Sequence, residues 1–158
     1  MRVVLPGSYD PVTRGHLEII RRAAERYDEV FAVVFINPDK SYTFSLDDRV
    51  KMLMLATEDL PNVLVSYSTG LVIDYMRDHH IDKIVKGIRN DEDLAYERVQ
   101  EEWNFTHGGY PTEYIYAEAA YTKLSSTLVR ERIANGESTE GLLPEKVEQF
   151  LKTSLTNV

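Results

Sequence analysis

Apolar residues recur along the chain in two alternating patterns, which predict that strands and helices follow one another. Five short runs, most of them rich in Val and Ile, have the length and composition of strands: Arg2–Leu5, Val30–Ile36, Val63–Tyr67, Lys83–Ile88 and Glu113–Ala117. The first, second and fourth runs are almost continuously apolar. That pattern is typical of strands that are buried on both faces of a parallel sheet.

Helical spacing separates these runs. The first helix is indicated by apolar residues three or four positions apart: Leu17, Ile20, Ala24 and Tyr27. A second helix is predicted from Ser45 to about Ala56, because Ser45 precedes Asp48 by three residues in an acidic variant of the capping box. The remaining helices are expected at Val72–His79, Asp93–Phe105, Thr127–Asn135 and Glu145–Lys152, the last of them after Pro144.

The alternation of strands and helices predicts an α/β fold, with residues 1–158 forming a single doubly wound, Rossmann-like domain. Its five-stranded parallel sheet would be flanked by helices. Ligands of such sheets bind outside the carboxyl ends of the strands, at the switch point of the topology. We therefore expect one pocket to collect the segments that follow the strands, namely residues 7–16, 37–40, 68–72, 87–91 and 121–127.

Composition narrows the class of protein. A chain of 158 residues with 43% hydrophobic and 28% charged residues is typical of a globular protein. It contains no cysteine, which excludes disulfides and thiolate metal sites and suits a reducing compartment. It also has no apolar run that approaches the length of a membrane span, and its first apolar stretch is too short for a signal peptide, so a cytoplasmic location is expected. The net charge of −8 argues against a protein that coats nucleic acid, although a few converging basic residues can still bind a small anion.

The stretch PGSYDPVTRGH, residues 6–16, has features of an anion site. Gly7 allows a turn at which a ligand can approach the backbone closely. Gly15 removes a side chain beside His16, where a helix is expected to begin, so an anion could reach both the imidazole and free N–H groups. Taken alone, a histidine at the start of a helix is more often a solvated surface residue.

The stretch KLSSTLVRE, residues 123–131, places three hydroxyl side chains before a helix. Ser125, Ser126 and Thr127 are all residue types that cap helices, and a cap needs only one of them. Hydroxyls and unpaired N–H groups at this position could hold a phosphate, with Arg130 one helical turn further along.

Two further segments carry basic residues after predicted strands. Lys86 and Arg89 flank Gly87, and Lys40 follows the second strand. Considered separately, salt bridges with neighbouring acids explain Lys86 and Arg89, and Lys40 is unremarkable. Considered together with His16 and the hydroxyl-rich helix start, they give one edge of the sheet a set of donors suited to phosphate oxygens.

Several common sites are excluded by their missing motifs. The sequence has no G-x-x-x-x-G-K-S/T loop and no G-x-G-x-x-G, so neither a P-loop enzyme nor a dinucleotide oxidoreductase is indicated. His79 and His80 are adjacent and no H-E-x-x-H occurs, which argues against a metal site built from protein ligands. A serine hydrolase would need a G-x-S-x-G elbow, which is also absent.

Two signatures resemble those of the nucleotidyltransferase α/β superfamily. Residues 13–16, Thr-Arg-Gly-His, resemble its His/Thr-x-Gly-His motif, and residues 125–130 resemble its Ser-Ser-Thr-x-x-Arg stretch. PGSYDPVTRGH, VKGIR, residues 93–97 and the late Leu143-Pro144 are similar to the bacterial phosphopantetheine adenylyltransferase family over nearly the whole chain. The resemblance implies transfer of AMP from ATP to 4′-phosphopantetheine, giving dephospho-coenzyme A and pyrophosphate by direct in-line attack.

The resemblance also assigns roles to residues. His16, Lys40 and Arg89 would be catalytic, with His16 stabilising the transition state. ATP would be bound by Ser8, Tyr9, His16, Gly87, Ile88, Arg89, Glu97, Tyr121, Thr122, Lys123, Leu124, Ser125, Ser126 and Thr127. The acceptor substrate would be bound by Ser8, Lys40, Val72 and Lys86. Mg²⁺ would arrive with ATP, without a metal ligand from the protein, and the family implies a homohexamer.

The chain departs from the family where Leu94 replaces an aromatic residue, Ala95 replaces an acid, and Glu101–Trp103 replace a methionine-rich run. Two alternatives remain. One is a related nucleotidyltransferase that acts on nicotinamide mononucleotide, pantoate or glycerol phosphate, against which VKGIR and residues 93–97 argue. The other is a module that binds nucleotides without turnover.

Overall fold

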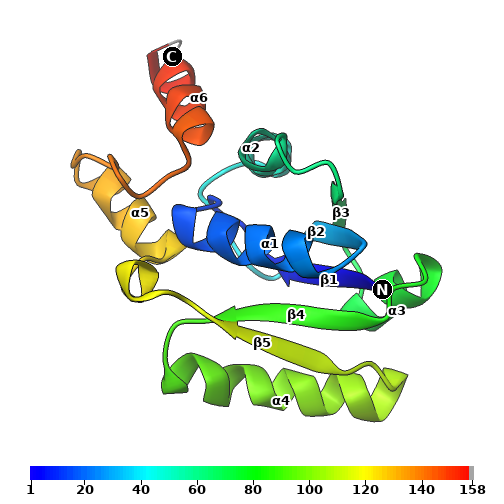
Figure 1. The fold of residues 1–158 in the computed structure, drawn as a ribbon. Helices are drawn as coiled ribbons and strands as arrows, with labels where there is room; N and C mark the ends of the chain where they lie inside the picture. Colours follow the sequence, from blue (N-terminus) through cyan, green and yellow to red (C-terminus); the bar gives the residue numbers. More distant parts are fainter. Residues whose placement is uncertain (157–158) are drawn as a thin grey trace.

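The fold consists of one parallel sheet with helices on both sides. A computed structural model of the chain describes residues 1–156. Five parallel strands pair in the order β3-β2-β1-β4-β5: β1 Arg2–Gly7, β2 Glu29–Phe35, β3 Val63–Ser68, β4 Lys83–Ile88 and β5 Thr112–Tyr116. The helices are α1 Arg14–Arg26, α2 Leu46–Thr57, α3 Val72–Asp78, α4 Asp91–Gly108, α5 Ser126–Ala134 and α6 Glu145–Thr156 (Figure 1). The α/β fold with a five-stranded parallel sheet is therefore confirmed.

The strand order creates a switch point between β1 and β4. The chain starts in the middle of the sheet at β1, moves out through β2 to the edge at β3, and then returns to pair β4 with the free side of β1. The loops that leave β1 and β4 consequently diverge to opposite sides. A crevice at this point is where sheets of this kind bind ligands.

The boundaries of some elements differ from those predicted, because caps and pairing extend beyond the apolar pattern. β1 continues past Leu5 to Gly7, whose backbone still pairs with Val34. α4 is longer than predicted at both ends, since the Asn90 side chain accepts the N–H of Asp93 and Gly109 ends the helix at a φ of 74°. A short 3₁₀ turn, η1 Ala119–Tyr121, lies in a segment that showed no periodicity.

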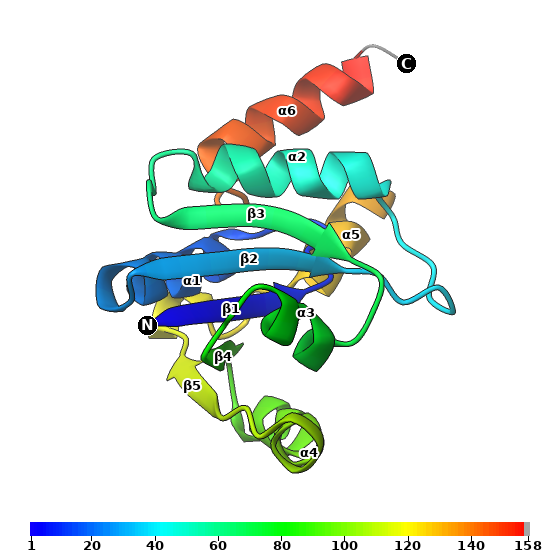
Figure 2. The same cartoon turned by 90° about the vertical axis from the view of Figure 1, so that its right-hand side faces the viewer.

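Each face of the sheet has its own apolar core. On one face, α1, α2, α5 and α6 cover alternate strand residues such as Val3 and Leu5. On the other face, Val4 packs with Tyr75 and Met76 of α3. Figure 2 shows α3 on the side of the sheet opposite to α1. Both faces are thus dry, which explains the nearly continuous apolar runs of β1 and β2.

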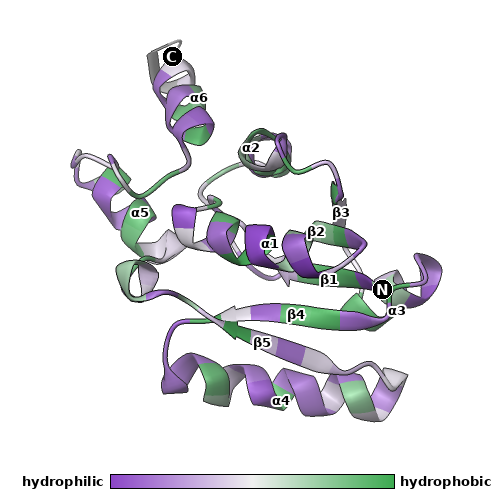
Figure 3. Cartoon of the chain, viewed as in Figure 1, coloured by the Kyte–Doolittle hydropathy of each residue, from purple (hydrophilic) through white to green (hydrophobic). Residues whose placement is uncertain are grey.

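Helix α4 is attached differently from the other helices. It spans 18 residues, yet none of its side chains is buried. Tyr96 and Val99 are about 70% exposed, at 69% and 71% respectively. Figure 3 shows hydrophilic residues mixed with hydrophobic ones along this helix. Within residues 1–156, no helix combines the length and apolar character that crossing a bilayer requires.

Candidate active site

A cavity of about 460 Å³ lies at the carboxyl ends of β1 and β4, at the switch point of the sheet. Its volume is in the range of small-molecule sites. Segments after β1, β2, β4 and β5 contribute to it, together with the start of α5. Most of the predicted site residues line it: Ser8, Tyr9, His16, Lys40, Lys86, Gly87, Ile88, Arg89, Glu97, Tyr121, Leu124, Ser125, Ser126 and Thr127.

Three predicted residues are not among those that line the cavity: Val72, Thr122 and Lys123. Val72 begins α3 and packs against the core on the far face of the sheet. Thr122 donates its hydroxyl to the carbonyl of Ala119. The whole loop 68–72 is missing from the cavity wall, because β3 is an edge strand two positions away from β1.

The cavity also includes residues that sequence reasoning did not assign. Asp10, Thr13, Tyr96 and Gln100 contribute to its wall. Asp10 lies within the PGSYDPVTRGH stretch, so its position in the motif was a usable signal. Gln100 follows Glu97 by three residues on α4, and only the register of that helix places both on the same side.

His16 is held in one tautomer by the start of α1. Its Nδ1 accepts the backbone N–H of Thr13 at 3.0 Å, while the Thr13 hydroxyl oxygen accepts the N–H of His16 at 3.3 Å. This reciprocal pair is a capping box in which histidine takes the usual place of glutamate. An Nδ1 that accepts a hydrogen bond carries no proton, so the proton of the neutral ring is on Nε2. His16 therefore offers one N–H donor, at Nε2.

His16 is also neutral at physiological pH. Burial, with a further contribution from the positive charge of Arg89, lowers the pKa of His16 to about 4. The tautomer and the charge thus agree, because both the capping box and the surroundings disfavour a proton on Nδ1. The site has a neutral donor of fixed direction rather than an imidazolium ion.

The ring of Tyr9 packs against the imidazole of His16. Its ring meets the imidazole edge-on, with centroids 5.2 Å apart. Its hydroxyl donates to the carbonyl of Leu5 at 2.8 Å, and burial raises its pKa well above the usual value. Tyr9 adopts a φ of 46°, which is unfavourable for a non-glycine residue and is maintained here by these contacts. Tyr9 thus lines the cavity, whereas its hydroxyl makes a structural hydrogen bond to β1.

The two basic residues of β4 and its following loop are paired with acids of α4. Arg89 donates from Nε and Nη2 to the carboxylate of Asp93, which also accepts the backbone N–H of Arg89. Lys86 donates to Glu97 at 2.7 Å and to Gln100 at 3.2 Å. Asp93 and Glu97 are one helical turn apart, so a single face of α4 orients both cations. The salt bridges considered from the sequence are present, and they lie at the cavity.

The glycines of the two loops have different functions. A Cβ at Gly87 would lie 2.8 Å from Cγ1 of Ile19, so this glycine lets α1 pack closely on β4. A Cβ at Gly15 would meet only ordinary contacts, the nearest being the Thr13 hydroxyl oxygen at 3.4 Å. Packing therefore does not require glycine at position 15. The remaining explanation is the one suggested by the sequence, namely that Gly15 keeps the space beside His16 free for a ligand.

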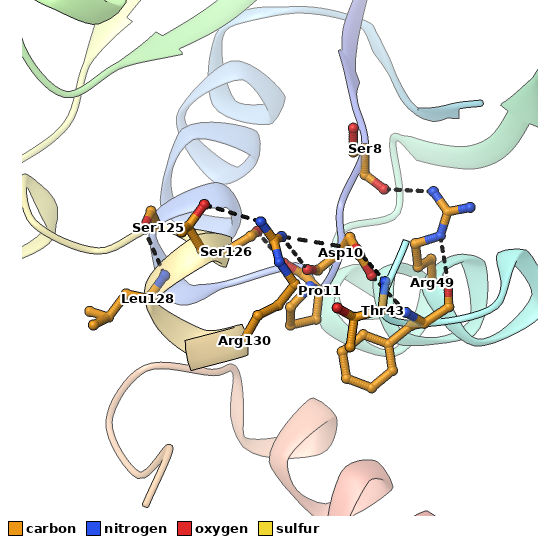
Figure 4. Close-up of polar contacts among 11 residues, drawn as sticks. Ser8, Asp10, Pro11, Thr43, Arg49, Ser125, Ser126, Leu128 and Arg130 are labelled. Carbon is orange, nitrogen blue, oxygen red and sulfur yellow. Dashed lines mark hydrogen bonds and ion pairs between the residues drawn. The ribbon is translucent and has the colours of Figure 1, made fainter. Parts of the chain in front are cut away.

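The three hydroxyls at the start of α5 all have partners within the chain. Ser125 caps the helix by accepting the N–H of Leu128, and Ser126 donates to the carbonyl of Pro11 at 2.7 Å (Figure 4). The hydroxyl oxygen of Thr127 accepts from Arg130. The surplus of hydroxyls thus has a structural explanation. For an anion, this helix start offers chiefly the N–H groups of its first turn, which have no carbonyl partner within the helix.

A polar network connects the loop after β1 with α5 and α2. The buried carboxylate of Asp10 accepts the N–H groups of Thr43 and Phe44, both at 2.9 Å. Arg130 donates to the backbone carbonyl of Asp10 at 2.8 Å, and Arg49 donates to that of Ser8 at 3.1 Å (Figure 4). These hydrogen bonds connect segments that are far apart in the sequence to the loop after β1. One of them fixes the backbone of Ser8.

Two other features bear on the identity of the site, namely acidic or histidine clusters and a further hollow of the surface. In the part of the chain that the structure describes, no three His, Asp or Glu side chains gather as a metal centre requires. Another hollow, of about 490 Å³, lies between α4 and the start of β5 and is lined by Arg98, Glu101, Glu102, Phe105, Pro111 and Thr112. It contains none of the predicted site residues. Glu101, one of the departures from the family, accepts the hydroxyl of Tyr114 at 3.1 Å.

Comparison with known proteins agrees with this geometry. Residues 4–132 match the family described as cytidylyltransferase-like. A phosphopantetheine adenylyltransferase of Thermobifida fusca (strain YX) is 40% identical over 151 residues, which are 96% of this chain and 92% of that protein. One of Clostridium novyi (strain NT) is 40% identical over 149 residues, 93% of this chain and 92% of that protein. The chain thus belongs to the cytidylyltransferase-like family and, within it, to the phosphopantetheine adenylyltransferases.

Proposed function

We propose that this protein transfers AMP from ATP to 4′-phosphopantetheine, giving dephospho-coenzyme A and pyrophosphate. The observation that carries the proposal is the cavity at the β1–β4 switch point, where His16 has a fixed Nε2–H donor and Lys40, Lys86 and Arg89 line the same cavity. The two relatives named above are called phosphopantetheine adenylyltransferases, which supports the choice of acceptor.

His16 donates from Nε2 to a non-bridging oxygen of the α-phosphate. The phosphate of the acceptor attacks the α-phosphorus in line, and pyrophosphate leaves on the opposite side. Negative charge on the α-phosphate oxygens is then met by a donor that is already oriented, because the capping box with Thr13 fixes the ring. A preorganised donor of this kind needs no reorganisation during the reaction.

The outer phosphates of ATP are bound by Arg89 and by the first turn of α5. Arg89 supplies a guanidinium fork whose orientation is set by Asp93, and α5 supplies backbone N–H groups at its positive end. Lys40 and Lys86, together with Ser8, bind the phosphate of the acceptor. No side chain acts as a nucleophile, so catalysis depends on positioning and on stabilising charge.

We expect Mg²⁺ to be brought by ATP rather than held by residues of this chain. Two carboxylates line the cavity, and both already have partners: Asp10 accepts two backbone N–H groups and Glu97 accepts Lys86. The residues of the cavity therefore do not provide an acidic cage for the ion. When bound, Mg²⁺ would neutralise phosphate charge, and the ligands for it would come from ATP and water.

Release of pyrophosphate tests the proposal directly. With ATP and 4′-phosphopantetheine, we expect turnover and the formation of dephospho-coenzyme A. Nicotinamide mononucleotide, pantoate and glycerol phosphate serve as matched alternative acceptors and should give no product. Turnover with one of these alone would assign another acceptor, and ATP binding without any pyrophosphate would identify a module that only binds nucleotides.

Residues 1–158 would work as one nucleotidyltransferase domain, and as a homohexamer in the cytoplasm. The exposed apolar side chains of α4, namely Tyr96, Val99 and Phe105, favour a partner surface in the assembled enzyme. Sedimentation velocity measures the assembly: a hexamer has six times the chain mass of 18.2 kDa, and a monomer would contradict this part of the proposal.

A further inference from the structure

The segment between β2 and α2 carries Lys40 and contains Tyr42, a residue to which the motifs assign no role. A tight turn shapes it, with the N–H of Lys40 bonded to the carbonyl of Asn37 and that of Asp39 bonded to the Asn37 side chain. The Tyr42 hydroxyl oxygen accepts the backbone N–H of Asn37 at 2.9 Å. Tyr42 thus adds a side-chain hydrogen bond to those that already hold the turn.

The Tyr42 ring is fixed from within the protein by Arg49. Arg49 is only 2% exposed, and its guanidinium donates to the carbonyls of Phe44 and Ser8. The guanidinium carbon lies 3.9 Å from the centroid of the Tyr42 ring. Burial of a charge is costly unless it is compensated, and the face of an aromatic ring provides part of that compensation. Removing the ring would leave this buried cation less well satisfied, so the ring position is strongly determined.

The same ring also contacts the side chain of Lys40. The Lys40 ammonium lies 5.5 Å from the ring centroid, within the range of cation–π attraction. Lys40 is otherwise an exposed, flexible side chain in an exposed loop, and it lines the cavity. The Tyr42 ring, whose position is fixed by Arg49, therefore restricts the rotamers of the Lys40 side chain.

We propose that Tyr42 is a positioning residue for Lys40, holding its ammonium group over the cavity where the acceptor phosphate binds. The inference rests on the proposed function, since it assumes that Lys40 serves the acceptor. It assigns Tyr42 no contact with either substrate. Tyr42 acts through Lys40, and Arg49 connects this arrangement to the backbone of Ser8, which also lines the cavity.

A double-mutant cycle tests the coupling between the two residues. Tyr42→Leu is expected to lower kcat/KM for 4′-phosphopantetheine about three- to tenfold, the range of one cation–π contact, while the Kd of ATP changes less than about twofold. Tyr42→Phe keeps the ring and should restore most of the lost activity. In the Lys40→Ala background, Tyr42→Leu should have almost no further effect, because its partner is gone.

Tyr67→Leu is the matched control, since Tyr67 is 57% exposed at the end of β3 and is not among the residues lining the cavity. It should retain the wild-type kcat/KM. Tyr42→Leu with unchanged kcat/KM would overturn the inference. A loss that multiplies in full with that of Lys40→Ala would also overturn it, because it would show that Tyr42 acts on stability or on another group. Lys40→Ala with wild-type turnover would remove the role of Lys40 and that of Tyr42 together.

A second measurement needs no turnover. Lysine side chains dimethylated with ¹³C-formaldehyde keep their charge, and the Lys40 signal is identified by its absence from Lys40→Ala. Ring-current shielding should displace this signal in the wild type and in Tyr42→Phe, and the displacement should vanish in Tyr42→Leu. A Lys40 signal that is the same in all three proteins would overturn the contact. Failure of the proposed reaction is thereby distinguishable from failure of the role given to Tyr42.

Discussion

Two of the helices that border the cavity, α1 and α4, are held to the sheet by different forces. α1 buries Ile19, Ile20 and Ala23 in the main core, and its first turn is closed by the Thr13–His16 capping box. α4 buries no side chain, and its contacts with β4 and β5 include the ion pairs of Arg89 and Lys86 and the Tyr114–Glu101 hydrogen bond. The wall of the cavity formed by α1 is therefore held by apolar packing, and the wall formed by α4 is held by polar contacts.

The difference matches the tasks proposed for each wall. A donor for the transition state benefits from rigidity, and apolar burial provides it because each buried side chain contributes roughly 1.5–3 kcal/mol. Partly exposed ion pairs contribute only about 0–1 kcal/mol each, so they can exchange partners when a phosphate arrives. His16 on α1 is therefore preorganised, whereas Arg89 and Lys86 are oriented in a reversible way by α4.

Removal of the rigid donor should give the largest effect. We expect His16→Ala to lower kcat by roughly 10²–10³-fold or more, the range for one transition-state donor, with a far smaller change in ATP affinity. Steady-state kinetics at saturating ATP and a direct binding measurement separate the two quantities. A variant that loses ATP binding but turns over normally at saturation would place His16 in ground-state binding instead.

On the α4 side, Arg89→Ala should weaken ATP by roughly 10- to 150-fold, corresponding to the loss of a charge-assisted hydrogen bond of about 1.5–3 kcal/mol. AMP lacks the outer phosphates and should lose much less affinity. Calorimetric titration of both nucleotides against the wild type and the variant measures this contrast. Equal losses for ATP and AMP would mean general destabilisation of the site rather than loss of a triphosphate contact.

Asp93→Asn tests whether α4 orients Arg89. It removes the carboxylate that accepts three N–H groups of Arg89 but keeps the arginine itself. We expect ATP to weaken by about two- to fivefold, the effect of one partly exposed ion pair, and amide exchange at the start of α4 to become faster than at the start of α1. Asp91→Asn, in the same helical turn, is the control. If both variants behave alike, the effect belongs to the helix dipole and not to Arg89.

The last prediction concerns the charge of His16, whose ring is not expected to change its protonation state near neutral pH. Because burial, and in addition the charge of Arg89, lowers the pKa of His16 to about 4, its ring should stay neutral from pH 8 down to about pH 5. The folded protein then binds this proton less readily than the unfolded chain. Stability contributed by this group is present above the unfolded pKa of about 6.5 and is lost as pH falls toward 4.

Heteronuclear NMR of the imidazole measures that titration. Arg89→Ala should raise the pKa of His16, since one of the two causes is removed and burial remains. An imidazole that titrates near pH 6.5 in the wild type would contradict the neutral donor and the fixed Nε2–H tautomer. In that case the two walls of the cavity would differ less than their packing suggests.

Much of the fold could be predicted because strands buried on both faces leave a clear apolar pattern. The alternation of runs such as Val30–Ile36 with helical spacing predicted a parallel sheet, and the carboxyl-end rule predicted where the cavity lies. The predicted ends of α4 were wrong, because the helix ends are set by the Asn90 cap and by Gly109, which lie outside the apolar periodicity. The short turn η1 has no periodic signal at all.

The sequence by itself determined the class of fold and the residue types that gather at one edge of the sheet. It could not determine strand order, and the position of β3 at the edge is what keeps the loop 68–72 and Val72 away from the cavity. The sequence also could not show which partners the polar and charged side chains of the site have within the chain. Ser126 is occupied by Pro11, Arg89 by Asp93, and the Tyr42 ring by Arg49 and Lys40. A sequence records separation along the chain, whereas a hydrogen bond or a cation–π contact requires a few ångströms in space, and only the packed tertiary structure decides which groups come that close.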